Sequence, residues 1–192
     1  MVLFGEKIKM KTVYLIHGWG RSSEEEWFVW LRRELEKKKI KVYAFDMPET
    51  DNPKIEVWVK HMEENIKDVD EETYFVGHSI GCQTIMRFLE KLPKHKIIGG
   101  CCFVAGWFDL VNLTKEEMAI AHPWINTKID FERIKRHTDN FLCIFSDDDN
   151  WVASSEHKVF KEELGAKIVI KKKMGHFEGV EKIPEVLDFL VK

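Results

Sequence analysis

The sequence predicts an α/β fold: a three-layer, doubly wound and mostly parallel sheet of about six strands, folded as a single domain over residues 1–192. Short apolar segments alternate with longer segments of helical spacing along nearly the whole chain. Alternation of this kind predicts parallel strands with helices on both faces of the sheet. A chain of 192 residues, 44% of them hydrophobic, is long enough to bury one core.

Each element is expected from its local pattern. Strands are expected near residues 12–16, 41–45, 73–76, 97–104, 141–145 and 167–171. Helices are expected near residues 24–38, 54–67, 82–92, 154–164 and 183–191. In the first helix, apolar residues recur at helical spacing from Trp27 to Leu35, and Ser23 is the expected N-terminal cap.

Right-handed crossovers and a switch point beside the first strand predict the strand order 2-1-3-4-5-6. That order brings the loop after the first strand next to the loop after the third. Residues 105–140 interrupt the alternation and are too short to form a full lid domain. We therefore expect a site that is only partly covered at this edge of the sheet.

The most informative motif is Gly-His-Ser-Ile-Gly at residues 77–81, which lies between a strand-like run and a helical pattern. Strand, sharp turn and helix with a serine at the apex is the context of a nucleophile elbow. Gly77 and Gly81 suit the close approach of strand and helix. The motif alone is weakly specific, but Ser79 is followed by other residues of the expected kind and order.

A His-Gly-Trp-Gly loop at residues 17–20 follows the first apolar run. In the hydrolase interpretation, the backbone N–H groups of Trp19 and Ile80 form an oxyanion hole. The alternative is an ordinary glycine-rich turn after a strand. A dinucleotide-binding loop is disfavoured because its third glycine is absent.

Three consecutive carboxylates, residues 147–149, follow the apolar run at 141–145. Acidic residues at the end of a parallel strand can orient a catalytic histidine. Asp149 is favoured because hydrolases of this kind usually follow the acid with two residues and a valine, and Val152 has that spacing. Asp148 is the alternative. A charged turn and a cation site are the rival interpretations of the same residues.

His176 follows the last predicted strand, inside Gly-His-Phe. The chain order is then Ser79, Asp149 and His176, which is the order of nucleophile, acid and base in α/β-hydrolases. The other seven histidines lack such a pattern, and His17 and His78 are expected to support the geometry of their loops.

Several tryptophans fall on loops near the predicted site. An apolar pocket wall is as compatible with them as plain packing, and it favours a small apolar or aromatic substrate. The residues predicted to bind substrate are His17, Gly18, Trp107, Trp124 and Trp151.

The composition restricts partners and location. A net charge of −3 gives no reason to expect nucleic acid or an anionic membrane as a partner. The four cysteines contain no Cys-x-x-Cys pair, so a zinc site is not expected, and no other metal or cofactor is predicted. Thiols in buried strands favour the cytoplasm. No membrane span is expected, and the apolar run at residues 1–4 is too short for a signal peptide.

Taken together, these motifs resemble the retinoblastoma-binding protein 9 family of small serine hydrolases, over nearly the whole chain after about residue 11. The resemblance rests on Trp27 and Trp30, residues 46–48, residues 77–81, Pro123-Trp124, the Asp148-Asp149 pair and residues 175–177. It implies a minimal α/β-hydrolase fold and a triad of Ser79, Asp149 and His176 that cleaves esters or amides.

Two departures limit what the resemblance implies. The loop at residues 17–20 is closer to general esterases than to the animal members of the family. The Leu-x-Cys-x-Glu motif behind the family name is absent, so a retinoblastoma-type partner is not expected.

The sequence therefore predicts a carboxylesterase-like serine hydrolase that cleaves an ester, thioester or amide of a small apolar substrate through an acyl-enzyme. Two alternatives stay open at this point. One is a binding or scaffold protein that retains the fold without turnover. The other is a metal-dependent hydrolase that uses residues 147–149.

Overall fold

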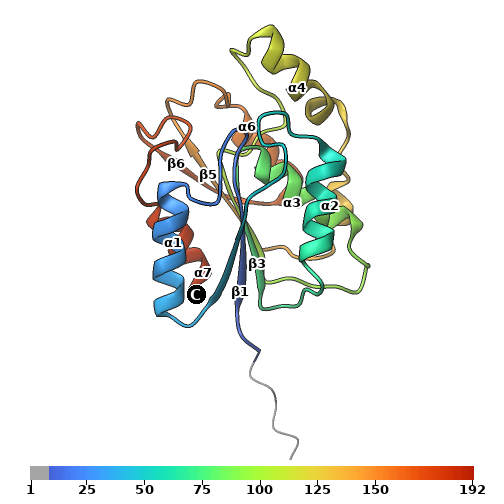
Figure 1. The fold of residues 1–192 in the computed structure, drawn as a ribbon, viewed down its shortest axis with the longest axis vertical. Coiled ribbons are helices and arrows are strands. Elements are labelled where there is room, and N and C mark those ends of the chain that lie inside the picture. Colours follow the sequence, from blue (N-terminus) through green and yellow to red (C-terminus); the bar gives the residue numbers. More distant parts are fainter. Residues whose placement is uncertain (1–8) are drawn as a thin grey trace, which may run out of the picture.

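A computed structural model of the protein describes residues 9–192, so the apolar run at residues 1–4 lies outside the described residues. Its centre is a six-stranded, wholly parallel sheet (Figure 1). In sheet order the strands are β2 (Lys41–Phe45), β1 (Thr12–Ile16), β3 (Thr73–His78), β4 (Gly100–Val104), β5 (Phe141–Ser146) and β6 (Lys167–Lys171). The predicted α/β fold and the predicted strand order are confirmed.

Helices cover both faces of the sheet. One face packs against α1 (Glu26–Lys37) and α7 (Pro184–Leu190). The other packs against α2 (Ile55–Asn65), α3 (Ile80–Lys91), α5 (Phe131–Lys135) and α6 (Glu156–Leu164). Each face has its own apolar cluster, so the molecule has the three layers that the alternation predicts.

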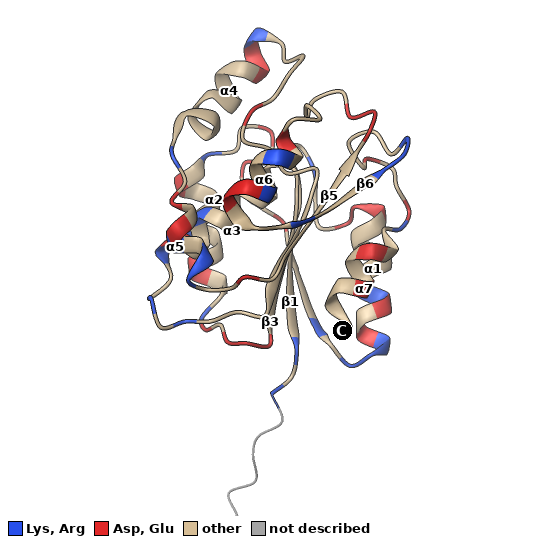
Figure 2. Ribbon diagram, turned by 180° about the vertical axis from the view of Figure 1, so that it is seen from behind, with Lys and Arg blue, Asp and Glu red and all other residues tan. Residues whose placement is uncertain are grey.

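The central strands are the most buried part of the chain. Every residue of β4 and β5 is buried, whereas β2 and β6, at the two edges of the sheet, expose part of their residues. Apolar side chains on both faces suit a central parallel strand, and lysines at an edge discourage pairing with another sheet. Figure 2 shows charges of both signs along α1 and α5 and few in the centre of the sheet.

Most element ends lie within two residues of the expected positions, and the fourth strand and the first helix cap differ for reasons that hydrogen bonds explain. The fourth strand begins at Gly100 rather than near residue 97, because the N–H of Ile98 donates to the carbonyl of His137 instead of joining the sheet. Ser23 does not cap the first helix. The cap position belongs to Glu25, and the N–H of Ser23 donates to Asp46 Oδ1 at 2.8 Å.

Residues 105–140 form two short helices rather than a lid domain. The first is α4 (Lys115–Asn126), which lies beyond the carboxyl ends of the strands (Figure 1). Buried Arg87 of α3 donates to the carbonyls of Trp124 and Thr127, both at 2.9 Å. The insertion is therefore fixed to α3, which is the helix that follows the predicted nucleophile.

Within residues 9–192, none of the helices has both the length and the apolar character needed to cross a bilayer.

Candidate active site

The turn between β3 and α3 holds Ser79 in an unusual backbone conformation, with φ 52° and ψ −122°. A non-glycine residue in this region costs of the order of 1–3 kcal/mol. The neighbouring glycines are required by close packing. A Cβ on Gly77 would lie 2.7 Å from the backbone nitrogen of Cys82, and one on Gly81 would collide with the carbonyl of Ile16. The turn therefore has the geometry of a nucleophile elbow.

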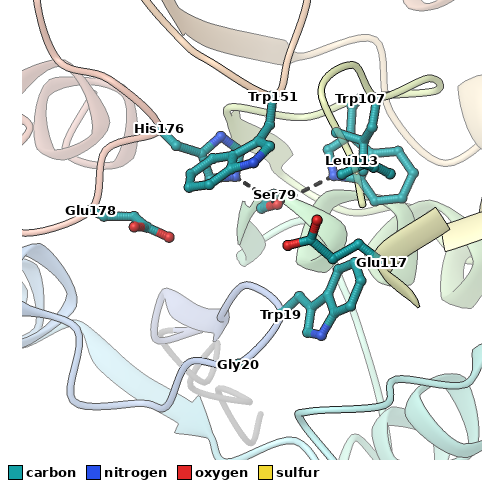
Figure 3. A pocket seen from close by; sticks show the side chains of 10 residues that line it. Trp19, Gly20, Ser79, Trp107, Leu113, Glu117, Trp151, His176 and Glu178 are labelled. Atoms are coloured by element: carbon teal, nitrogen blue, oxygen red, sulfur yellow. Dashed lines mark hydrogen bonds between the residues drawn. The ribbon is translucent and has the colours of Figure 1, made fainter. Parts of the chain in front are cut away.

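Ser79, His176 and Asp149 lie in one chain of hydrogen bonds. Ser79 Oγ is 2.9 Å from His176 Nε2 (Figure 3). His176 Nδ1 is 2.8 Å from Asp149 Oδ2. The three residues come from the loops after β3, β6 and β5, which meet at one edge of the parallel sheet. The side chains of His176 and Asp149 are only 8% and 2% exposed, so competition from water at these bonds is small.

The second oxygen of Asp149 is bound to its own loop. Oδ1 accepts the N–H groups of Trp151 and Val152 at 2.9 and 3.0 Å. Burial by itself raises the pKa of the Asp149 carboxyl, but hydrogen bonds from His176 and these two N–H groups bring that pKa below its usual value. Asp149 is therefore ionised at neutral pH and faces the histidine with one defined oxygen.

The two neighbouring carboxylates have different partners. Asp148 Oδ1 accepts the hydroxyl of Ser146 and the N–H of Gly175 at 2.7 and 2.9 Å. Asp147 Oδ1 accepts the N–H of Lys173 at 2.8 Å. Both acids therefore hold the loop after β6 against the end of β5 by hydrogen bonds. Neither of them hydrogen-bonds to the His176 ring.

The loop after β1 lies against the elbow. A Cβ on Gly18 would be 3.4 Å from the Cβ of Ser79, so the two loops nearly touch. Among the described residues, the backbone N–H groups of Trp19 and Ile80 have no hydrogen-bond partner within the protein. Two free donors beside a serine are the requirement for binding an oxyanion.

A buried contact between His78 and Glu25 connects three of these loops. His78 Nδ1 lies 2.8 Å from Glu25 Oε2, and His78 Nε2 donates to the carbonyl of His176 at 2.8 Å. The N–H of Gly18 donates to Glu25 Oε1 at 3.3 Å. Burial by itself lowers the pKa of His78, but the Glu25 carboxylate raises it, and the resulting pKa lies above its usual value. The His78 ring thus links the elbow to the loops after β1 and β6.

Ser79 opens into a pocket of about 230 Å³. This volume is below the roughly 300–1,000 Å³ typical of sites for drug-sized ligands, so the pocket suits a small molecule. The lining residues are Trp19, Gly20, Ser79, Trp107, Leu110, Leu113, Glu117, Trp151, His176 and Glu178.

Of the residues predicted to bind substrate, Trp107 and Trp151 line the pocket and three others do not. Trp124 is 1% exposed and lies within α4, where its indole N–H donates to the carbonyl of Pro53. His17 is fully buried, and its Nε2 accepts the N–H of Met47 at 2.9 Å. Gly18 lies beneath the elbow and donates to Glu25, so the structure gives it and His17 supporting positions.

A family model described as "Serine hydrolase" matches residues 13–192. The chain belongs to the serine hydrolase family. The YdeN hydrolase of Bacillus subtilis is 31% identical to it over 183 residues, which cover 94% of each chain. The crystal structure of the ydeN gene product superimposes with a TM-score of 0.86 and covers 94% of this chain and 97% of its own.

The resemblance to the retinoblastoma-binding protein 9 family is confirmed as well. Serine hydrolase RBBP9 of Rattus norvegicus is 26% identical to this serine hydrolase over 167 residues, which are 86% of this chain and 85% of the rat protein. A monoacylglycerol lipase from Paleococcus ferrophilus shares the fold at 17% identity, with a TM-score of 0.71 over 94% of this chain and 93% of that chain.

The serine hydrolase places one hydrogen-bond donor at Ser79 that its sequence did not indicate. Trp107 Nε1 donates to Ser79 Oγ at 3.2 Å (Figure 3). The Trp107 carbonyl accepts from the side chain of Gln83 at 3.0 Å. Trp107 was predicted only as a pocket wall. Its contact with Ser79 depends on the course of the chain after β4, and no local sequence pattern predicts that course.

Replacing Trp107 with phenylalanine in this serine hydrolase is expected to lower kcat about three- to ten-fold, as loss of one hydrogen bond predicts. The bond holds the Ser79 hydroxyl in one orientation, so its loss should lower kcat by leaving that hydroxyl less well aligned. The measurement is kcat for a small ester. Trp151→Phe is the matched control, because it removes an indole N–H from the same pocket that makes no hydrogen bond to Ser79. Equal losses in both variants would contradict a role for the Trp107 N–H.

Proposed function

We propose that this hydrolase cleaves an ester of a small, largely apolar substrate by acyl transfer to Ser79. The single observation that carries the proposal is the hydrogen-bond chain from Asp149 through His176 to Ser79, whose hydroxyl opens into the pocket. Thioesters and amides undergo the same chemistry and are alternative substrates. The carboxylesterase class fits the small pocket with its three indoles.

In the proposed reaction, Ser79 Oγ attacks the substrate carbonyl carbon while His176 Nε2 takes the hydroxyl proton. Asp149 holds the Nδ1–H tautomer of His176 and stabilises the imidazolium that forms. The oxyanion of the tetrahedral intermediate accepts the N–H groups of Trp19 and Ile80. His176 then returns the proton to the leaving alcohol, which leaves an acyl-enzyme.

Water completes the cycle. His176 removes a proton from a water molecule, which attacks the acyl carbonyl, and the second tetrahedral intermediate collapses to release the acid and restore the Ser79 hydroxyl. Ser79, His176, Asp149 and the two backbone donors account for every proton transfer and every charge in this cycle.

A cytoplasmic location belongs to the same proposal. All four cysteines are buried free thiols, which suits a reducing compartment.

Labelling with a fluorophosphonate probe, followed by peptide mapping, tests the proposed function. We expect one label, on Ser79, because the probe reacts with activated serines. Cysteines should not compete, since burial raises the pKa of all four thiols.

Heat-denatured protein and Ser79→Ala are the controls, and both should remain unlabelled. Absence of labelling in protein that circular dichroism shows to be folded would contradict the proposal and favour a binding protein with the hydrolase fold.

A further inference from the structure

The charged side chains of the pocket all have one sign. Glu117 and Glu178 line it, and no lysine or arginine is among its lining residues. Figure 3 shows both carboxylates directed toward the space in front of Ser79, from opposite sides. They come from segments far apart in the chain, so their convergence depends on the fold.

Of the two pocket carboxylates, Glu117 is the one whose negative charge is not offset by a neighbouring basic side chain. It is the third residue of α4, where it completes a capping box with Thr114, accepting that residue's N–H at 2.7 Å. These hydrogen bonds to Thr114 hold the pKa of Glu117 below its usual value. No basic side chain pairs with it among the described residues. Glu178, in contrast, forms an ion pair with Arg21, which offsets its charge.

The second feature of the pocket is its three indole side chains. Trp19, Trp107 and Trp151 line the same small pocket. The face of an indole carries partial negative charge and attracts an ammonium group, and aromatic residues arranged around a cavity are a known means of binding quaternary ammonium ions. Apolar walls with one unpaired carboxylate therefore suit a group that is both bulky and positively charged.

We propose that the pocket selects esters that carry an ammonium group near the scissile bond, with Glu117 and the indoles as the specificity determinants. This inference rests on the proposed function, because it assigns a substrate class to the same Ser79 site. Anionic esters should be poor substrates, since their charge would face Glu117 in a pocket lined by no compensating cation.

The test compares two acetate esters of the same shape: acetylcholine and its uncharged carbon analogue, in which a tert-butyl group replaces the trimethylammonium group. We expect kcat/KM to favour the charged ester about ten-fold. The preference should fall as salt rises, because the pocket is partly open to solvent.

Glu117→Gln removes the charge and keeps the capping box, because glutamine serves equally at that position. We expect the variant to lose most of the preference for the charged ester, measured as the ratio of the two kcat/KM values. Glu116→Gln is the matched control: it removes one charge from the neighbouring position of α4, is exposed, and does not line the pocket. The control should keep the full preference.

A second measurement does not require turnover of either ester. Choline and its uncharged carbon analogue are compared as protectants of Ser79 against the fluorophosphonate probe, and choline should protect at a roughly ten-fold lower concentration. Equal protection, or equal kcat/KM for the two esters, would overturn the charge preference and leave the proposed hydrolase function intact. Failure of Ser79 to react with the probe at all would instead overturn the proposed function, and this inference with it.

Discussion

Ser79→Ala is expected to lower kcat for ester hydrolysis by about six orders of magnitude, to the limit of detection. The substitution removes the atom that forms the acyl-enzyme, and water cannot occupy the same position with the same alignment. Substrate binding should survive, because the three indoles and the two backbone donors remain. The measurement is kcat and KM for a short-chain acetate ester, with thermal unfolding as the check on folding.

Ser155→Ala is the matched control for this substitution. Ser155 is exposed, and its side chain makes no cap hydrogen bond at the start of α6. Its loss should leave kcat unchanged. If Ser79→Ala retained more than about a tenth of the wild-type kcat, the proposed nucleophile would be wrong, since deleting a nucleophile costs far more than that.

Asp149→Asn is expected to lower kcat about 10⁴-fold. The reason is that Asp149 Oδ1, the carboxylate oxygen that does not contact His176, is bound to the backbone of its own loop. Trp151 and Val152 donate their N–H groups to Oδ1, so the asparagine carbonyl must take that position. The amide NH₂ group is then forced toward His176 Nδ1, where it stabilises the tautomer that carries its proton on Nε2. That tautomer cannot accept the proton of Ser79.

Asp148→Asn is the comparison that decides between the two candidate acids. Asp148 contacts the backbone of Gly175 rather than the His176 ring, and an asparagine carbonyl can still accept that N–H, so Asp148→Asn should lower kcat only about ten-fold or less. A larger loss in Asp148→Asn than in Asp149→Asn would assign the orienting role to Asp148. The measurement is kcat for both variants side by side, with circular dichroism as the control for folding.

Local patterns were sufficient to predict the scaffold. Parallel strands with apolar residues on both faces and helices at regular spacing have few possible arrangements, and right-handed crossovers leave one order for the strands. The same reasoning predicted that the loop at residues 17–20 would lie beside the loop that carries Ser79, because the carboxyl ends of neighbouring parallel strands lie at one edge of the sheet.

Details that depend on packing between distant segments were not predictable. Trp124 was expected on a loop at the site, but α4 extends through it and turns its indole toward Pro53. The bond from Trp107 to Ser79 depends on an insertion that Arg87 fixes from beneath. The spacing to Val152 favours Asp149 among the three acids at residues 147–149, and the fold of the loop after β6 brings the His176 ring within 2.8 Å of its Oδ2.

The backbone conformation of Ser79, the proposed nucleophile, lowers the folding stability of the protein. A glycine at this position would adopt φ 52° without steric cost, so the chain would gain of the order of 1–3 kcal/mol in folding free energy as it lost the hydroxyl. Selection for heat resistance alone would therefore favour Ser79→Gly, and a descendant with this substitution would lose the hydroxyl and melt at a higher temperature than its ancestor.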